Sequence, residues 1–284
     1  MTNTDPVAVL GAGVMGTGIA TLALGHGLPV VLVDVDDAVL ERALAQVARQ
    51  LKLGRLMGGL PRESADGRLI TTTDLSAIVG ARAVVESVTE KPGLKKEVLA
   101  AATAVIRPGT PVVTNTSAIP VDELAEAAAR PDEFLGAHFM NPPYLIKTIE
   151  VVRGPRTSDV ALAAVLELLG EVGQQPVVVG DGPGFVVNRI LQRVINEAAR
   201  IVQEGIATPE AVDALFTGCL GHRTGPLGTA DLIGLDNVVD SLHVLLDRTG
   251  DEGYRPCDLL VTKVKAGEHG RKTGKGFYDH GGVL

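Results

Sequence analysis

The residues best suited to chemistry lie near the middle of the chain, where a histidine is followed by a carboxylate in a second apolar run. Residues 136–142 read Gly-Ala-His-Phe-Met-Asn-Pro, and Glu150 stands within the apolar run 148–152. A carboxylate inside an apolar strand is costly unless it has a partner, and His138 is the nearest suitable one. Such a pairing fixes the histidine tautomer and supports the charged ring, as the orienting acid of a general base does. The simpler alternatives are a hydrogen-bonded core histidine and a half-exposed Glu150.

Two more polar residues follow predicted strands. Glu90 comes after the apolar run 83–88, and Ser117 comes after the run 111–114. In parallel α/β sheets, ligands bind beyond the carboxyl ends of the strands, so both residues are candidates for a site. The alternatives are a solvated charge at a helix start for Glu90 and the N-cap of a helix near 121–129 for Ser117.

A glycine-rich turn near the start of the chain predicts a dinucleotide site. The apolar run 7–10 leads into Gly-Ala-Gly-Val-Met-Gly at 11–16, and a helical stretch follows at 17–25. The first glycine permits a tight turn, the second lets a pyrophosphate approach the backbone, and the third allows close helix–strand packing. The helix N-terminus offers N–H groups and a positive dipole to the phosphates. A purely structural glycine turn is the alternative. The expected contacts are Gly11, Gly13, Val14, Met15 and Gly16.

The choice of dinucleotide depends on the acid that ends the second apolar run, 30–33. Asp34 stands there, and a carboxylate in this place accepts hydrogen bonds from ribose hydroxyls. Together with Asp36 and Asp37 it would repel a 2′-phosphate, so the sequence favours NAD over NADP.

Strand and helix patterns alternate through the first part of the chain. This alternation predicts an α/β fold, a Rossmann-type doubly wound parallel sheet, over residues 1–182. Besides the runs already named, the predicted elements are strands at 69–72 and 177–180 and helices at 39–53 and 91–103.

Residues 183–284 are predicted to form an all-helical C-terminal domain. A glycine- and proline-rich stretch at 181–184 marks the boundary, and no strand pattern is evident after Asp181. Thr208 and Pro209 form a typical helix start. The other predicted helices span 185–205, 226–246 and 256–266.

The composition limits the partners and the compartment. The 284 residues are 45% hydrophobic and 21% charged, as in a globular protein with a sizeable core. The net charge of -8 argues against nucleic acid as a partner, because phosphate contacts need clustered lysine and arginine. The two distant cysteines, Cys219 and Cys257, suit a reducing compartment. No basic signal region or bilayer-length apolar run is seen, so no membrane is expected and the expected location is the cytoplasm.

Taken together, these motifs resemble the L-3-hydroxyacyl-CoA dehydrogenase family, which includes bacterial 3-hydroxybutyryl-CoA dehydrogenases. The resemblance covers nearly the whole chain, with several independent motifs in the same order. They are the segments 11–16 (Gly-Ala-Gly-Val-Met-Gly), 85–88 with Glu90 and Lys95, 115–117 (Asn-Thr-Ser), 138–142 with Glu150, 184–189 (Gly-Phe-Val-Val-Asn-Arg) and 270–278.

The resemblance implies roles for individual residues. His138 would remove the proton of a 3-hydroxyl group while hydride leaves carbon 3 for the nicotinamide of NAD, and Glu150 would orient His138. Ser117 and Asn188 would hydrogen-bond the reacting oxygen or the histidine. A homodimer is implied, and no metal ion is expected. The residues implied for the NAD site, besides the glycine turn, are Asp34, Glu90, Lys95, Ser117, Asn141 and Lys272.

Some segments depart from the family pattern. The turn at 219–226 carries His222 and Arg223 where a less charged turn is usual, and Met140 and Pro143-Tyr144 follow the histidine unusually. These departures leave the thioester carrier open. One alternative is an ordinary short-chain acyl-CoA. The other is a glyceryl-type group on an acyl carrier protein, since the departures are similar to the branch of the family that serves polyketide extender-unit synthesis.

Two other functions compete with this one. Dehydrogenases related to 6-phosphogluconate dehydrogenase share the domain plan but use a catalytic lysine on the long helix, where this chain has Asn188 and Arg189. A non-catalytic, crystallin-like nucleotide-binding protein is the second competitor, and the presence of His138 and Glu150 argues against it.

Overall fold

The computed structural model describes residues 5–63 and 67–281. The chain divides into two compact units, with the boundary between Gly182 and Pro183. Each unit has its own hydrophobic core.

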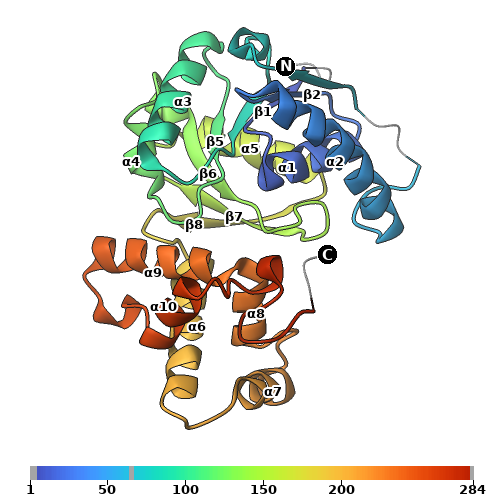
Figure 1. Ribbon diagram of the computed structural model, residues 1–284. Coiled ribbons are helices and arrows are strands. Elements are labelled where there is room, and N and C mark those ends of the chain that lie inside the picture. Colours follow the sequence, from blue (N-terminus) through green and yellow to red (C-terminus); the bar gives the residue numbers. More distant parts are fainter. Residues whose placement is uncertain (1–4, 64–66, 282–284) are drawn as a thin grey trace. The chain divides into compact units, whose positions relative to one another are not determined.

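The first unit is built on one eight-stranded sheet (Figure 1). The strand order is β3-β2-β1-β4-β5-β6-β7-β8, and every neighbouring pair is parallel except β6 and β7. The order reverses between β1 and β4, and a dinucleotide binds at such a switch point. The strands are β1 (Val7–Leu10), β2 (Val30–Val33), β3 (Leu69–Thr72), β4 (Ala83–Glu86), β5 (Val112–Thr114), β6 (Phe134–His138), β7 (Thr148–Arg153) and β8 (Gln175–Gly180).

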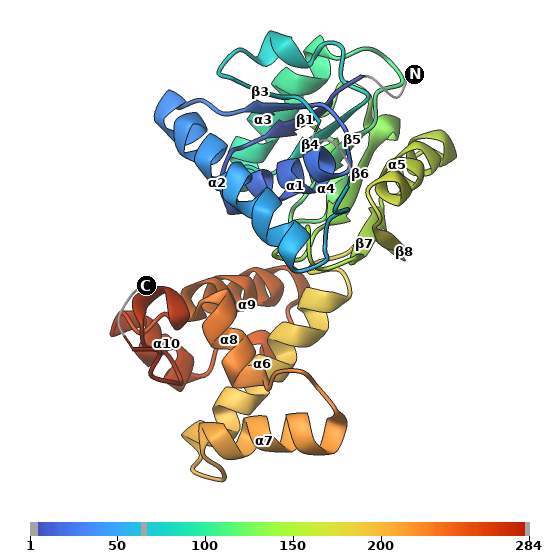
Figure 2. The same cartoon turned by 90° about the vertical axis from the view of Figure 1, so that its right-hand side faces the viewer.

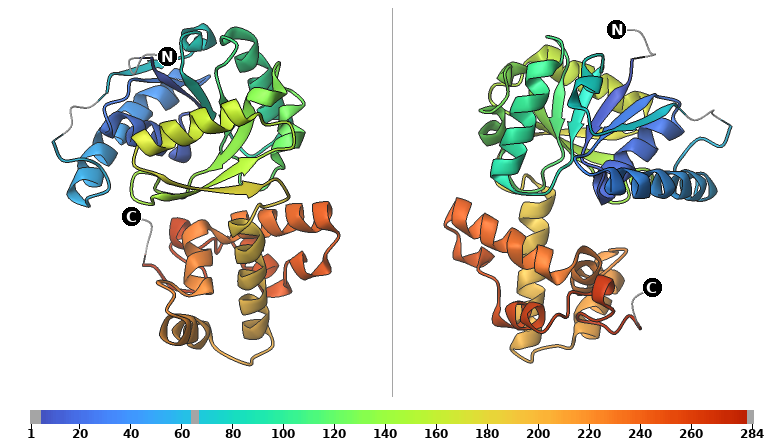
Figure 3. Two further views of the ribbon diagram at one scale, coloured as in Figure 1. Left: turned by 180° about the vertical axis from the view of Figure 1, so that it is seen from behind. Right: turned by 45° about the horizontal axis from the view of Figure 1, so that its top comes forward.

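Helices cover both faces of this sheet (Figures 2 and 3). The helices α1, α2 and α5 share one core cluster with alternate strand residues. The opposite face carries α3 and α4, and a side chain of α4, Val121, packs directly over Gly136 of β6. The helices are α1 (Val14–Gly25), α2 (Asp37–Leu56), α3 (Pro92–Val105), α4 (Val121–Ala125) and α5 (Asp159–Glu171). The predicted doubly wound α/β fold is therefore confirmed.

In the described part of the second unit, every regular element longer than an isolated bridge is a helix. Thr208 caps α7 through its side chain, and Pro209 occupies the first turn, as the sequence predicts. None of the described helices in either unit combines the length and the apolar composition needed to cross a bilayer. The helices of this unit are α6 (Val187–Gln203), α7 (Pro209–Leu220), α8 (Pro226–Ile233), α9 (Leu235–Thr249) and α10 (Asp258–Lys265).

The single helix predicted over 226–246 is wrong. Gly234 adopts φ 99°, a left-handed conformation that ends α8 at Ile233 and lets α9 start in a new direction. The helix predicted near 121–129 is also shorter than expected, because α4 ends at Ala125.

Candidate active site

The glycine-rich turn lies at the carboxyl end of β1, and each of its glycines has a separate structural reason. Gly11 adopts φ 97°, and a Cβ there would lie 2.7 Å from the carbonyl oxygen of Ser87, beyond β4. A Cβ on Gly16 would lie 1.8 Å from the carbonyl oxygen of Gly11. At Gly13 nothing lies within 4 Å of the Cβ position. The turn therefore leaves open the one position where a pyrophosphate must approach, at the N-terminus of α1.

Asp34, at the end of β2, faces this turn. Its Oδ2 accepts a hydrogen bond from the amide of Ala12 at 2.7 Å, which places the carboxylate at the edge of the expected dinucleotide site. Asp36 has a different task, because its carboxylate accepts from the amide of Ala38 and caps α2. The cap leaves the negative charge of Asp36 in place, and the backbone N–H of Asp36 donates to Asp34 Oδ1 at 3.3 Å, so the expectation that Asp36 backs Asp34 against a 2′-phosphate stays a prediction.

The predicted pairing of the histidine and the carboxylate is present. His138 and Glu150 stand opposite each other in the antiparallel β6–β7 ladder, and Nδ1 lies 2.7 Å from Oε2. Each residue is only 5% exposed, so Glu150 is not the half-exposed strand residue of the alternative interpretation. Because Nδ1 faces Glu150, proton transfer to a substrate would use Nε2, the other ring nitrogen.

Glu90 organises the turn that carries Ser117. Its Oε1 accepts hydrogen bonds from the amide of Ser117 at 2.8 Å, the amide of Ala118 at 3.3 Å and the hydroxyl of Thr116. Ser117 is not a helix N-cap, because α4 is preceded by Pro120 in that role. The side chain of Glu90 is 41% exposed, so it stays partly solvated while it holds this turn. The structure brings the two predicted residues together at the carboxyl edge of the sheet.

Lys95 is buried, with 1% of its surface exposed. Its Nζ contacts Glu86 Oε1 at 2.8 Å, Glu90 Oε2 at 3.1 Å and the carbonyl oxygen of Val88 at 3.2 Å. The charge implied for the NAD site is thus held by two carboxylates and a backbone carbonyl oxygen. Glu86, fully buried, was not singled out from the sequence. The available signal was an acid ending an apolar strand, with a lysine on the following helix.

Three other residues predicted for the site are Asn141, Asn188 and Lys272. Asn141 is exposed and lies three residues after His138, in a segment that begins with a cis Asn141–Pro142 bond. Asn188, in the first turn of α6, and Lys272 both belong to the second unit. Lys272 donates a hydrogen bond to Asp236 at 2.6 Å. Burial alone would raise the pKa of Asp236, but the hydrogen bonds from Lys272 and from a neighbouring backbone amide outweigh burial and lower this pKa.

The segment after the histidine packs against the glycines of α1 and α2. Pro143 lies against Gly18, where a Cβ would approach its ring to 2.7 Å. Tyr144 is 5% exposed and lies against Gly54 and Gly59. Burial raises the pKa of its hydroxyl. Pro143 and Tyr144 therefore anchor the segment, and of the three unusual residues only Met140 is even partly exposed.

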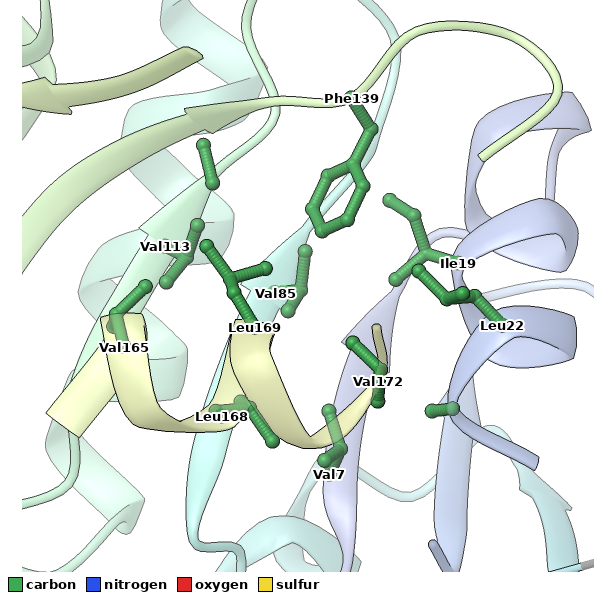
Figure 4. A pocket seen from close by; sticks show the side chains of 12 residues that line it. Val7, Ile19, Leu22, Val85, Val113, Phe139, Val165, Leu168, Leu169 and Val172 are labelled. Atoms are coloured by element: carbon green, nitrogen blue, oxygen red, sulfur yellow. The ribbon is translucent and has the colours of Figure 1, made fainter. Parts of the chain in front are cut away.

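The described residues enclose a small cavity in the first unit and a larger groove in the second. A cavity of about 30 Å³ lies in the first core between the sheet, α1 and α5; its lining is apolar and includes Phe139, Val85 and Leu169 (Figure 4). It is too small for a substrate. A groove of about 460 Å³ lies in the second unit, between α6, α7 and the start of α8, with His222 and Arg223 in its lining.

Comparison with known proteins agrees with this geometry. The NAD-binding domain of 3-hydroxyacyl-CoA dehydrogenase matches residues 6–182, and the C-terminal domain of the same family matches residues 184–280. A probable 3-hydroxybutyryl-CoA dehydrogenase of Deinococcus radiodurans is 40% identical over 274 residues, covering 96% of this chain and 99% of the relative. The 3-hydroxybutyryl-CoA dehydrogenase of Bradyrhizobium diazoefficiens is 39% identical over 281 residues, covering 98% and 96%.

A solved structure matches equally well. The (S)-3-hydroxybutyryl-CoA dehydrogenase PaaH1 from Ralstonia eutropha superimposes with a TM-score of 0.89 at 36% identity, covering 98% of this chain and 99% of that one. The two domain matches, the near-complete coverage by the relatives and the shared fold lead to one conclusion. This chain belongs to the 3-hydroxyacyl-CoA dehydrogenase family.

Proposed function

We propose that this protein oxidises the 3-hydroxyl group of a short 3-hydroxyacyl-CoA to the 3-oxo group, with NAD as the hydride acceptor. The observation that carries the proposal is the buried His138–Glu150 pair at the carboxyl end of β6. A base held this way suits the removal of an alcohol proton. The same edge of the sheet carries the open glycine turn beside Asp34.

In the proposed mechanism, Nε2 of His138 takes the proton of the 3-hydroxyl group. Glu150 holds Nδ1, keeps the ring in one orientation and stabilises its positive charge while the proton is bound. Ser117 and Asn188 donate hydrogen bonds to the reacting oxygen. When bound, NAD supplies the hydride acceptor, and the protein supplies its orientation.

The cofactor contacts are part of the same proposal. The glycine turn binds the pyrophosphate, and Asp34 accepts from the adenosine ribose. Glu90, Asn141 and Lys272 are the further proposed residues of the NAD site, and Lys95 acts through Glu90. The placement of Glu90 beside the Ser117 turn supports its part in this assignment.

The proposed carrier is CoA. The matched relatives are named for CoA thioesters, which supports CoA over an acyl carrier protein. The test offers purified protein and NAD the (S)-3-hydroxybutyryl group on each carrier and follows NADH formation. Faster turnover on CoA is expected. Strongly preferred turnover on the acyl carrier protein would overturn the carrier assignment. No NADH from any 3-hydroxyacyl thioester would overturn the function and favour a crystallin-like protein.

We also propose a homodimer formed through the second unit. The groove beside α6 is lined mostly by apolar side chains, and Ile190 there is 61% exposed. An apolar surface of this kind favours a protein partner. Light scattering coupled to gel filtration should give twice the chain mass, and Ile190→Asp should shift the population toward the monomer.

A further inference from the structure

Phe139, the residue that directly follows the histidine strand, lies beyond the ladders to both neighbouring strands. The parallel ladder between β5 and β6 ends at the pair Thr114–Gly136, and the antiparallel ladder between β6 and β7 ends at His138–Glu150. The next backbone N–H belongs to Phe139, whose residue is only 6% exposed. A buried N–H group without an acceptor is strongly disfavoured, so it needs a partner from outside the ladders.

The side chain of Asn115 supplies that partner. Its Oδ1 accepts the hydrogen bond of the Phe139 amide at 3.0 Å, and Asn115 itself is 8% exposed. Asn115 directly follows β5 and stands two residues before Ser117. A side-chain hydrogen bond thus replaces strand pairing at Phe139, directly after His138. It joins the turn that carries Ser117 to the histidine strand.

Asn115 is itself held firmly. The backbone N–H of Asn115 donates to the carbonyl oxygen of Glu86 at 2.8 Å, which extends the β4–β5 pairing by one residue. The hydroxyl of Thr114 donates to Glu86 Oε2 at 2.7 Å and accepts from the amide of Thr116 at 3.2 Å. The anchor on the β4 side is therefore the buried Glu86–Lys95 cluster.

We infer that Asn115 is a positioning residue of the active site, which keeps His138 in register with the turn that carries Ser117. The inference rests on the proposed function, because register matters only if the two residues act on one substrate. Reacting groups tolerate little displacement, and a shift of about 1 Å can lower a rate about 100-fold. Asn115 acts through the backbone of Phe139, so it should affect turnover without contributing to cofactor affinity.

The experiment compares Asn115→Ala, which removes the acceptor, with Asn115→Asp, which keeps an oxygen at the same reach. Asn115→Ala should lower kcat for NAD-dependent oxidation of 3-hydroxybutyryl-CoA about 10- to 100-fold. The Kd for NAD should stay within about twofold, and Asn115→Asp should recover most of the lost kcat. Wild-type kcat in Asn115→Ala, or parallel losses of kcat and NAD affinity in both variants, would overturn the inference.

A matched control separates positioning from stability. Thr103 of α3 is buried, and its hydroxyl accepts the amide hydrogen bond of Ala129 at 3.0 Å. Thr103→Val removes a bond of the same type near the opposite end of the sheet, so it should lower the Tm without changing kcat. A fall in kcat comparable to that of Asn115→Ala would show a general effect of stability and would overturn the inference.

A second readout does not depend on turnover. In wild-type protein, NMR should show a protected Phe139 amide and one sharp set of His138 ring nitrogen signals. In Asn115→Ala the amide should exchange faster and the ring signals should broaden. If wild-type protein forms no NADH, the proposed function fails, and these spectra still decide whether Asn115 orders the histidine. Unchanged spectra would overturn the inference in that case as well.

Discussion

At the scale of residues, the charge of Lys95 is held by protein groups. The ammonium lies between two carboxylates, one of them fully buried, and its contact with Glu90 holds the turn of Ser117 in place. A family resemblance alone does not reveal this arrangement. Because Lys95 neutralises a buried carboxylate, its loss should lower the stability of the fold, whereas the loss of an exposed cofactor ligand should not.

Replacing Lys95 should therefore destabilise the fold. Lys95→Met leaves Glu86 buried without its counter-charge, which should lower the free energy of unfolding by about 3–5 kcal/mol in urea titrations. Lys96→Met is the control, because Lys96 is partly exposed and its pairing with Glu126 at 3.3 Å should be worth no more than about 1 kcal/mol. Equal stability of the two variants, with NAD affinity lost only in Lys95→Met, would instead identify Lys95 as a direct ligand.

The proposed acceptor for the adenosine ribose, Asp34, allows a test of the preference for NAD over NADP. Asp34→Ala removes a charged acceptor for the ribose hydroxyls, so the Kd for NAD should rise at least about tenfold, while NADP binding should not weaken. Asp36→Ala removes the cap of α2, which should cost about 1 kcal/mol of stability, and it should change the NAD to NADP ratio less than Asp34→Ala does, because Asp34 is the expected ribose acceptor. Calorimetric titration measures the Kd of each variant for NAD and for NADP. A larger loss for NADP than for NAD in Asp34→Ala would contradict the cofactor assignment.

At the scale of elements, helix α1 has a structural role in addition to its proposed role in phosphate binding. Gly18, one turn into α1, makes room for Pro143, so the helix also supports the segment that follows the histidine strand. On a bare helix, replacing glycine by alanine is stabilising, because glycine costs about 0.5–1 kcal/mol there. Contact with Pro143 should reverse that sign.

Gly18→Ala should thus destabilise the protein by about 1–3 kcal/mol, since the added methyl group overpacks a tight contact. The matched control is Gly170→Ala near the end of α5, where nothing lies within 4 Å of the Cβ position and stability should increase by about 0.5–1 kcal/mol. Denaturant unfolding gives both values. Stabilisation by both substitutions would show that the contact between Pro143 and α1 has room for an added methyl group.

At the scale of the whole molecule, charge clusters make stability depend on pH. In the second unit, hydrogen bonds from Lys275 and Lys263 lower the pKa of Glu268 from 4.5 to about 2. A lowered pKa means that the folded state favours the ionised carboxylate. The resulting stability is present above pH 4.5 and is lost as the pH falls toward 2.

The Glu268→Gln variant removes this titration. Its Tm should be lower than that of wild type at neutral pH, and the difference should shrink as the pH falls from 4.5 toward 2. Calorimetry at a series of pH values measures this difference. A constant gap across that range would show that the lysines stabilise the folded protein through something other than the ionised Glu268.

The sequence predicted those features that depend on neighbours along the chain. The glycine turn and the apolar strand runs are local patterns, and the His138–Glu150 pairing needed only one assumption, that two successive strands meet. The burial of Lys95 was not predicted, because it depends on the face of the sheet from which Glu86 points toward α3. The burial of Tyr144 likewise depends on two glycines, one in α2 and one just after it. The roles of Asn188 and Lys272 stay predictions.

The central claim is that His138 is the base of a 3-hydroxyacyl-CoA dehydrogenase. The most direct measurement is the initial rate of NADH formation from (S)-3-hydroxybutyryl-CoA and NAD by wild type, His138→Gln and His26→Gln. His26 directly follows α1, and its ring hydrogen-bonds the carbonyl oxygen of Leu22 at 2.9 Å, so its variant should match wild type. His138→Gln should be about 100-fold slower or more, as expected for a lost general base. Equal rates for His138→Gln and wild type would contradict the mechanism.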